Sequence, residues 1–239
     1  PQWTANGVAV CSAAGDQYVK GDPGAVAFVS DGSGGAYTAW MDGRNGNNDV
    51  YAQRINSAGT SLWTANGEVI CTAAGSQQSP SVAFDTHSPG LFVVWEDWRS
   101  GTNCDVYAQR MTPTGSVSWS AGGVAVENGA SDGYNPRVVP DALGGAIVAW
   151  FDYRTMDANI YAQRLSSVGG PLWTAGGVTV CGASGSQWKP EIIADASNGA
   201  IVSWEDKRGG AGNEAEDIFA QRLNSQGALL WPTEVVVCN

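Results

Sequence analysis

The sequence is poor in basic residues, with 12 Lys and Arg against 23 Asp and Glu and a net charge of −11 at pH 7. Nucleic-acid phosphates and anionic membranes both require a basic partner surface. No segment approaches the roughly 18 to 20 consecutive apolar residues of a membrane-spanning helix, and residues 1–30 lack the basic start and apolar run of a signal peptide. The composition therefore excludes nucleic-acid binding and membrane insertion. Because the chain begins at Pro1 rather than Met, we expect a mature product or a part of a longer protein.

Histidine is almost absent as well, since His87 is the only one. A Ser-His-Asp triad or a histidine-based zinc site cannot be assembled around one histidine in an apparent turn, DTHSPG. The loops RNGNND at Arg44 and GNEAED at Gly212 carry oxygen ligands that calcium could use, but neither matches an ordered calcium loop. We therefore expect no cofactor, with calcium as the alternative.

Glycine and tryptophan are abundant instead, with 32 Gly and 11 Trp, and an internal repeat accounts for most of the tryptophans. The motif W-x-D-x-R occurs four times. Each copy is followed by an aromatic-Ala-Gln-Arg segment, and then by another tryptophan ahead of an apolar strand. The motifs begin at Trp40, Trp95, Trp150 and Trp204, and the later tryptophans are Trp63, Trp119, Trp173 and Trp231.

Each repeat consists of short alternating apolar segments broken by Gly, Asp, Asn and Pro, which is the pattern of β-strands. Four antiparallel strands, here named A to D, in a unit of about 55 residues are typical of a β-propeller blade, and a parallel β-helix or a β-sandwich fits less well. We predict an all-β fold, a β-propeller of four blades of four antiparallel strands with an extra strand-D segment at the N-terminus. One domain over 1–239 would have blades at about 12–71, 72–127, 128–181 and 182–239, with 1–11 as a closing or extra outer strand. The first repeat carries about six extra residues before strand A, near 20–25.

The repeat resembles secreted bacterial β-propeller repeat proteins that carry the pattern P-x-V-x-x-D…GG-x-x-x-x-W-x-D-x-R…D-[IV]-Y-A-Q-R…G-x-x-x-W. The likeness covers nearly the whole chain. It implies the propeller fold and a secreted or cell-surface location, and it implies no particular activity.

Residues present in every blade are interpreted as scaffold, because catalysis rarely needs four identical groups arranged symmetrically. We expect Asp–Arg pairs that link strand ends and neighbouring blades, and buried tryptophans that anchor each blade. The structural residues predicted in this way are Trp40, Trp95, Trp150, Trp204, Asp42, Asp97, Asp152, Asp206, Arg54, Arg110, Arg164 and Arg222.

Function is sought where the blades differ. The loops after strand D and after strand B emerge on one face of a propeller, called here the loop face, and aromatic residues are concentrated there. Flat rings beside amides and carboxylates suit sugars, although the same rings could simply close the ends of the blades. We expect a noncatalytic extracellular module, not an enzyme, that binds a glycan or an extracellular protein. The candidate ligand-binding residues are Tyr18, Trp98, Tyr134, Tyr153, Trp188 and Lys189.

A glycoside hydrolase is a lesser alternative, because Glu96–Asp97 and Glu205–Asp206 occur in the second and fourth repeats. Such enzymes use two carboxyl groups roughly 5 to 9.5 Å apart. Adjacent residues of a strand point to opposite faces, however, so each pair is split between the two faces of its sheet.

Self-assembly is another alternative, because residues 3–11 (WTANGVAVC) repeat the strand-D segment and give five such segments for four sets of strands A to C. The extra segment could close the ring beside the fourth blade, or it could complete a neighbouring molecule. Cys11, Cys71, Cys181 and Cys238 share one repeat position, where the second blade has Glu127. Only Cys11 and Cys238 would share a blade and could form a disulfide.

Overall fold

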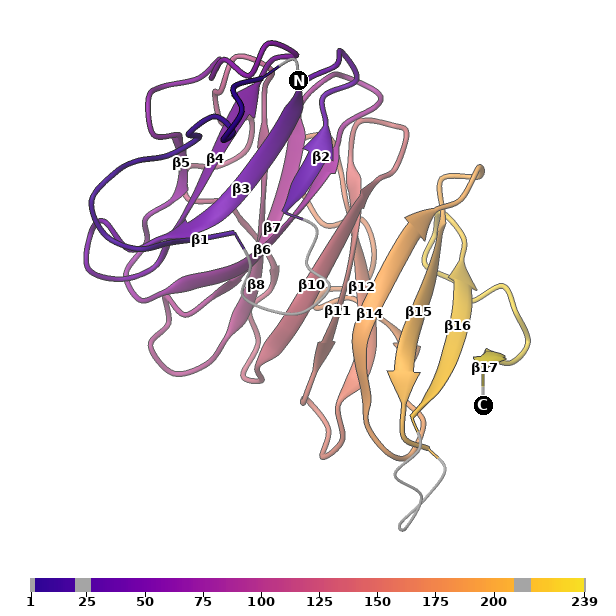
Figure 1. Ribbon diagram of the computed structural model, residues 1–239. Coiled ribbons are helices and arrows are strands. Elements are labelled where there is room, and N and C mark those ends of the chain that lie inside the picture. The colour runs from indigo at the N-terminus through magenta and orange to yellow at the C-terminus, as the bar shows by residue number, and fades with distance from the viewer. Residues whose placement is uncertain (1–2, 20–26, 209–215, 239) are drawn as a thin grey trace.

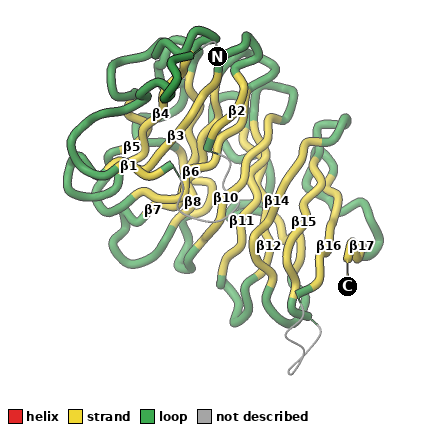
Figure 2. The backbone as a smooth tube through the Cα atoms, in the orientation of Figure 1, coloured by secondary structure: helices red, strands yellow, loops and turns green. Residues whose placement is uncertain are grey.

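The computed structural model describes residues 3–19, 27–208 and 216–238, and these ranges contain strands and turns only (Figures 1 and 2). No helix in them could therefore cross a membrane. The strands form four antiparallel sheets in chain order, called here blades 1 to 4, which is the predicted β-propeller architecture.

Blade 1 contains β1 (Gln17–Tyr18), β2 (Phe28–Ser30), β3 (Ala36–Asp42), β4 (Asp49–Ile55) and β5 (Glu68–Cys71). Blade 2 contains β6 (Gln77–Phe84), β7 (Leu91–Asp97), β8 (Asp105–Met111) and β9 (Val124–Glu127). Blade 3 contains β10 (Gly133–Pro140), β11 (Ala146–Asp152), β12 (Asn159–Leu165) and β13 (Val178–Cys181). Blade 4 contains β14 (Gln187–Ala194), β15 (Ala200–Asp206), β16 (Asp217–Leu223) and β17 (Val235–Cys238).

Strand A of blade 1 differs from that of the other blades. It is divided between β1 and β2, and both pair with β3. The extra residues expected near 20–25 fall between these two strands and lie outside the described residues. In blades 2 to 4 strand A is continuous, with a bulge where the register shifts ahead of a proline. The residues at this bulge, Ser79, Asn135 and Lys189, have left-handed backbone conformations.

The hydrophobic core lies between the sheets. Three clusters of buried residues join blades 1 and 2, blades 2 and 3, and blades 3 and 4. The W-x-D-x-R tryptophans are almost fully buried, and each indole N–H donates to the aspartate two residues later, as from Trp95 to Asp97 at 2.7 Å. Each of these tryptophans also stacks on the strand-C aromatic opposite it, as Trp95 does on Tyr107. Repetition of these contacts sets the geometry of every blade.

The Asp–Arg pairs lie within single blades, which corrects the expectation that they link neighbouring blades. Asp97 accepts from Arg99 of its own motif, and Arg110 of strand C pairs with Asp85 in the A–B turn of the same sheet. The same geometry recurs for Arg54, Arg164 and Arg222, which pair with Asp31, Asp141 and Asp195. Among the cross-blade hydrogen bonds are those of the later tryptophans, whose indole N–H groups donate to a C–D turn carbonyl of the next blade: Trp63 to Pro113, Trp119 to Ser167 and Trp173 to Ser225. Arg54 and Arg164 also donate to the Pro113 and Ser225 carbonyls, so these two arginines reach the next blade although their aspartates do not.

Residues 3–11 make the same kind of contact without forming a strand. Trp3 donates to the Ser57 carbonyl of blade 1 at 2.7 Å, and the Cys11 sulfur lies 3.3 Å from Arg44 Nη2. Strand β17 pairs with β16 in blade 4. The two terminal segments therefore do not compete for one position. The disulfide between Cys11 and Cys238 is not formed, because Cys11 lies beside Arg44 of blade 1 whereas Cys238 lies in β17 of blade 4, and both thiols are free.

Candidate functional site

One junction between blades departs from the repeat, and it lies on the loop face between blades 2 and 3. At the end of strand D, blades 1 and 3 carry Cys71 and Cys181, whose sulfurs contact the motif arginine of the next blade at 3.2 Å. In blade 2 this position is Glu127, which is 5% exposed. A buried glutamate in place of a cysteine brings an ionisable group to a position that is apolar elsewhere.

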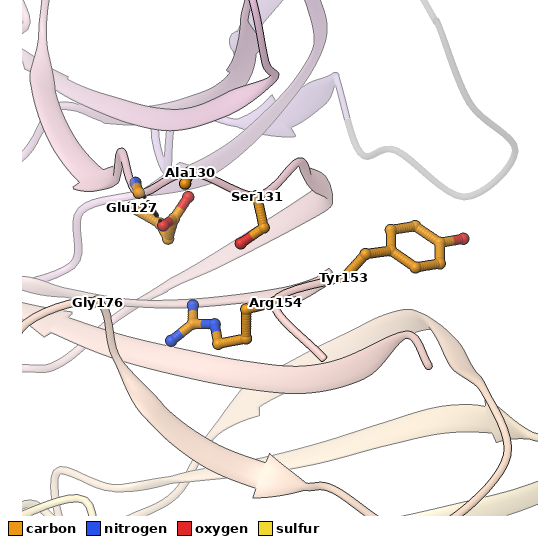
Figure 3. Close-up of a pocket in the computed structure, with 7 residues that line it drawn as sticks. Glu127, Ala130, Ser131, Tyr153, Arg154 and Gly176 are labelled. Carbon is orange, nitrogen blue, oxygen red and sulfur yellow. Dashed lines mark hydrogen bonds between the residues drawn. The ribbon is translucent and has the colours of Figure 1, made fainter. Parts of the chain in front are cut away.

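Glu127 faces a cavity of about 530 Å³ that is lined by the 129–131 segment, Tyr153, Arg154 and Gly176. In Figure 3 the side chains of Glu127 and Ser131 approach the cavity from one side and Arg154 approaches it from the other, while the Tyr153 ring extends away along its edge. The cavity lies between the loop that follows β9 and the loop that follows β11, and both belong to the loop face predicted to carry function.

Only one of the two side-chain oxygens of Glu127 has a hydrogen-bond partner among the described residues. Its Oε1 accepts the Gly129 N–H at 2.6 Å, whereas its buried Oε2 has no hydrogen-bond partner among the described residues. Burial raises the pKa of this carboxyl above its ordinary value of 4.5; the Gly129 N–H opposes the shift, as does the charge of Arg154, and Asp152 reinforces it. Glu127 is therefore suited to carry a proton that it can donate to a ligand.

Arg154 faces Glu127 but is paired elsewhere. Its guanidinium donates to Asp152, with Nε at 2.9 Å from Oδ1, and it stacks over the Tyr161 ring. In blade 2 the equivalent Arg99 also donates through Nη2 to the Gly122 carbonyl and to Cys71. Within the described ranges Arg154 hydrogen-bonds to Asp152 alone, so Nη1 remains available to a ligand oxygen. The cavity thus has an acid on one side and a hydrogen-bond donor on the other.

Two more carboxyl groups lie at this junction. The Asp132 carboxylate accepts the Cys104 N–H at 2.8 Å and so ties the loop after β9 to blade 2. Glu96 is buried between the blades, where it accepts from the Ser79 hydroxyl at 3.2 Å and from the Asn135 N–H at 2.9 Å. Burial raises the pKa of Tyr134, and the nearby charges of Asp132 and Glu96 act in the same direction. Both carboxyl groups are therefore close to the Tyr134 ring.

Three of the predicted ligand-binding residues come together beside the cavity and form what we call the aromatic shelf: Trp98, Tyr134 and Tyr153. The ring centroids of Trp98 and Tyr134 are 6.5 Å apart, and those of Tyr134 and Tyr153 are 6.3 Å apart. Phe151, which pairs with Tyr134 across the strands, packs against both tyrosines. Tyr153 also lines the cavity, so the shelf and the cavity are continuous.

The other predicted ligand-binding residues lie apart from the shelf. Tyr18 is exposed in blade 1, where its hydroxyl bonds to Asp16. In blade 4 the Trp188 ring is capped by Lys207 at 5.0 Å, and Lys189 is paired with Glu205 at 2.7 Å. The structure therefore assembles half of the predicted set at one junction.

Among the described residues, no group of three or more His, Cys, Asp or Glu side chains could hold a metal ion. In the RNGNND loop, Asn45 hydrogen-bonds to Asp49 at 2.7 Å. Most of the GNEAED loop lies outside the described residues. The His87 N–H bonds to Asp85 in the A–B turn, which lies at the opposite end of the blade from the loop face.

Glu127 is the residue that sequence reasoning missed. The substitution of Glu for Cys at a repeated position is visible in the sequence, but by itself it does not show that the position is buried. In the structure, blades 1 and 3 bury this position as Cys71 and Cys181, whereas Cys238 of blade 4 is exposed.

No family model matches the chain, and no curated protein matches it. Solved structures do share its fold. An α-L-arabinanase of Penicillium chrysogenum, solved with arabinobiose, is 12% identical with a TM-score of 0.56 over 84% of this chain and 63% of its own. An endo-1,5-α-L-arabinanase of Thermotoga petrophila is 15% identical with a TM-score of 0.51, over 87% of this chain and 59% of its own. An α-L-arabinofuranosidase of Lactobacillus brevis is 8% identical with a TM-score of 0.51, over 87% of this chain and 70% of its own. The chain thus spans about six-tenths of the length of the two arabinanases.

These likenesses establish the fold, and they correct the functional expectation. A noncatalytic binding module, or an assembly protein in its place, was expected, together with the absence of enzymatic activity. That expectation is contradicted by the three solved structures named above, which are two arabinanases and an arabinofuranosidase.

Proposed function

We propose that the chain is a glycoside hydrolase that acts on an extracellular glycan at the cavity between blades 2 and 3. The observation that carries the proposal is Glu127, a carboxyl with a raised pKa that lines the cavity and whose buried Oε2 has no hydrogen-bond partner among the described residues. A glycosidase needs such a carboxyl to remain protonated and to donate to the leaving-group oxygen. The glycoside hydrolases with the same fold support the assignment of reaction class.

The proposed reaction is hydrolysis of a glycosidic bond by two carboxyl groups. Glu127 transfers its proton to the glycosidic oxygen as the bond between that oxygen and the anomeric carbon breaks. Asp132, on the loop between Glu127 and the shelf, takes a proton from the water that forms the new bond to the anomeric carbon. Arg154 donates to a sugar hydroxyl through its free nitrogen. Together these groups place one sugar ring between an acid and a fixed donor.

Two other roles of the carboxyl groups fit the geometry less well. Asp152 is held by Arg154 and Trp150, as its counterparts are in the other blades. Glu96 is occupied with Ser79 and Asn135 at the blade junction, whereas Asp132 directly follows the 129–131 segment that lines the cavity. Of the carboxyl groups at this junction that belong to no repeated Asp–Arg pair, Glu127 lines the cavity and Asp132 directly follows the lining segment.

The proposal is tested by release of reducing sugar from a panel of soluble polysaccharides, beginning with arabinan because of the arabinanases that share the fold. We expect turnover by the wild type, and Glu127→Gln should lower it by about 100-fold or more, the contribution of a general acid. Activity should fall as the pH rises through the raised pKa of Glu127, because the group must be protonated to act.

Matched variants locate the site. Glu68→Gln makes the same chemical change in blade 1, where Glu68 bonds to the Thr64 N–H, and should leave activity unchanged. Asp132→Asn should reduce turnover without loss of folding. Loss of activity in Glu96→Gln but not in Glu127→Gln would place the chemistry at the other carboxyl. Absence of turnover on every glycan by a folded wild type would refute the proposal.

A further inference from the structure

The aromatic shelf is specific to the junction of blades 2 and 3, because the equivalent positions at the other junctions do not form a row of rings. At the position of Trp98 and Tyr153, blade 1 has Gly43 and blade 4 has Lys207. The junction of blades 3 and 4 would bring Tyr153 to Trp188 by the same symmetry, yet Trp188 is covered by Lys207. Among the described residues, only the junction of blades 2 and 3 presents a continuous row of rings at the loop face.

The shelf is held rigidly from below and from the side. The Trp98 N–H donates to the Ser76 carbonyl at 2.9 Å, which fixes the start of its loop. Phe151 supports Tyr134 and Tyr153 from within the blade. Asp132 bonds across the junction to the Cys104 N–H and so keeps the two loops together. Rings that are ordered before binding lose little conformational entropy when a ligand packs on them.

The charge of the site restricts what can pack there. Glu96 and Asp132 are acidic groups at this junction in addition to Glu127, which the proposed reaction needs protonated, and the one nearby cation that faces the cavity, Arg154, is neutralised by Asp152. A sugar that carries a carboxylate would meet like charge along the shelf. A neutral sugar would place its apolar C–H face on the rings and its hydroxyls against the carboxyl groups.

We propose that the shelf binds the sugar units that adjoin the one held in the cavity, so that the substrate is a neutral oligosaccharide or polysaccharide of at least three units. This inference rests on the proposed function for the reaction, but it concerns binding and can be measured without turnover. From the cavity rim outward the ring centroids are 6.3 and 6.5 Å apart, and the rings lie at 77° and 53° to one another, so that each ring offers successive sugar units a differently oriented apolar contact.

The test is affinity electrophoresis of the Glu127→Gln protein in gels containing arabinan, xylan, mannan or polygalacturonate. A neutral polymer should retard the protein, and polygalacturonate should not. Calorimetry with oligosaccharides of one to six units from the retarding polymer should show affinity rising up to at least three units. Trp98→Ala should lower the affinity for the longer oligosaccharides by up to about tenfold, the contribution of one aromatic contact, and leave the monosaccharide unaffected.

Two further variants keep the test decisive. Tyr153→Ala removes a ring that is 44% exposed, so it tests the shelf even if Trp98→Ala fails to fold. Tyr18→Ala removes an exposed ring of blade 1 outside the shelf and should have no effect. Affinity that does not depend on chain length, or preference for polygalacturonate, would overturn the inference. Length-dependent binding without any cleavage would refute the hydrolase and leave the shelf intact.

Discussion

The indole N–H of Trp119 donates a hydrogen bond of 2.9 Å to the carbonyl oxygen of Ser167, which belongs to the next blade. Trp63 and Trp173 make the same bond at the other two junctions between sheets. Because the Trp119 ring is 6% exposed, this bond forms in a largely dehydrated contact between blades. The later tryptophan of each repeat therefore determines how closely the next sheet can approach.

Trp119→Phe should lower the free energy of unfolding by about 1 kcal/mol through loss of this hydrogen bond, and by about 1 kcal/mol more because phenylalanine lacks the pyrrole part of the indole and leaves a small void. Trp119→Ala should cost about 3 to 5 kcal/mol because it also leaves a cavity. Urea titration followed by circular dichroism measures both. Trp231→Phe is the matched control, because the Trp231 indole makes no cross-blade hydrogen bond within the described ranges. A cost equal to that of Trp119→Phe would show that the bond to Ser167 contributes nothing.

Gly123→Ala should destabilise the protein strongly, because Gly123 has φ of +91° and a methyl group there would lie 2.5 Å from the buried Trp95 ring. The backbone cost alone is about 1 to 2 kcal/mol for a left-handed residue, and overpacking adds about 1 to 3 kcal/mol. Gly101→Ala has a similar φ of +73° with open space around it and should show the backbone cost only. Equal midpoints of urea unfolding for the two variants would contradict the role assigned to the Trp95 contact.

Stability should fall in acid because of two motif aspartates, Asp42 and Asp206, whose pKa values are lowered in the folded protein. Burial opposes ionisation of Asp206, but hydrogen bonds from Arg208 and Trp204 outweigh it and lower the pKa below the ordinary 3.8. A carboxyl whose pKa is lowered by folding contributes its full stabilisation above its unfolded pKa and loses it as the pH falls through the folded value. Unfolding midpoints should therefore decrease below about pH 4, and Asp206→Asn should flatten that decrease while lowering stability at pH 7.

Asp49 provides a control of opposite sign. Burial raises the pKa of Asp49, so protonation of this group favours the folded state as the pH falls. Asp49→Asn removes that favourable contribution and should make the acid limb steeper. The same slope in Asp49→Asn and Asp206→Asn would show that the motif pairs do not govern acid unfolding.

The sequence was sufficient to predict the blades, because strand alternation and the W-x-D-x-R spacing are local properties. It could not assign the partner of each arginine, because the aspartate that binds Arg54 lies 23 residues earlier in a turn and the repeat supplies several aspartates at similar distances. It also could not place residues 3–11. These residues match the strand-D pattern, so their chemistry fits the edge of blade 1 and the edge of blade 4 equally well until the packing of Trp3 on the Ser57 turn is known.

The candidate site was predicted in part for a related reason. Trp98, Tyr134 and Tyr153 were identified because they vary between blades on the loop face, and the structure brings them together. Glu127 was not, because a single glutamate among cysteines carries no information about burial. The surroundings of Glu127 depend on the folded structure, in which the loop after β9 packs against its side chain and the Gly129 N–H donates a hydrogen bond to one carboxylate oxygen.

Glu127→Cys restores the residue that the repeat uses elsewhere, and it should stabilise the protein while abolishing activity. A buried acceptor without a partner costs about 1 to 3 kcal/mol, and a cysteine at this position can contact the motif arginine, as Cys71 does with Arg99 at 3.2 Å. We expect the free energy of unfolding to rise by about 1 kcal/mol under reducing conditions, with turnover lowered by about 100-fold or more. Glu127→Gln should match the loss of turnover without the gain in stability, because its amide remains a buried polar group. A cysteine variant less stable than the wild type would mean that Glu127 supports the fold rather than being retained at a cost to stability for chemistry in the cavity.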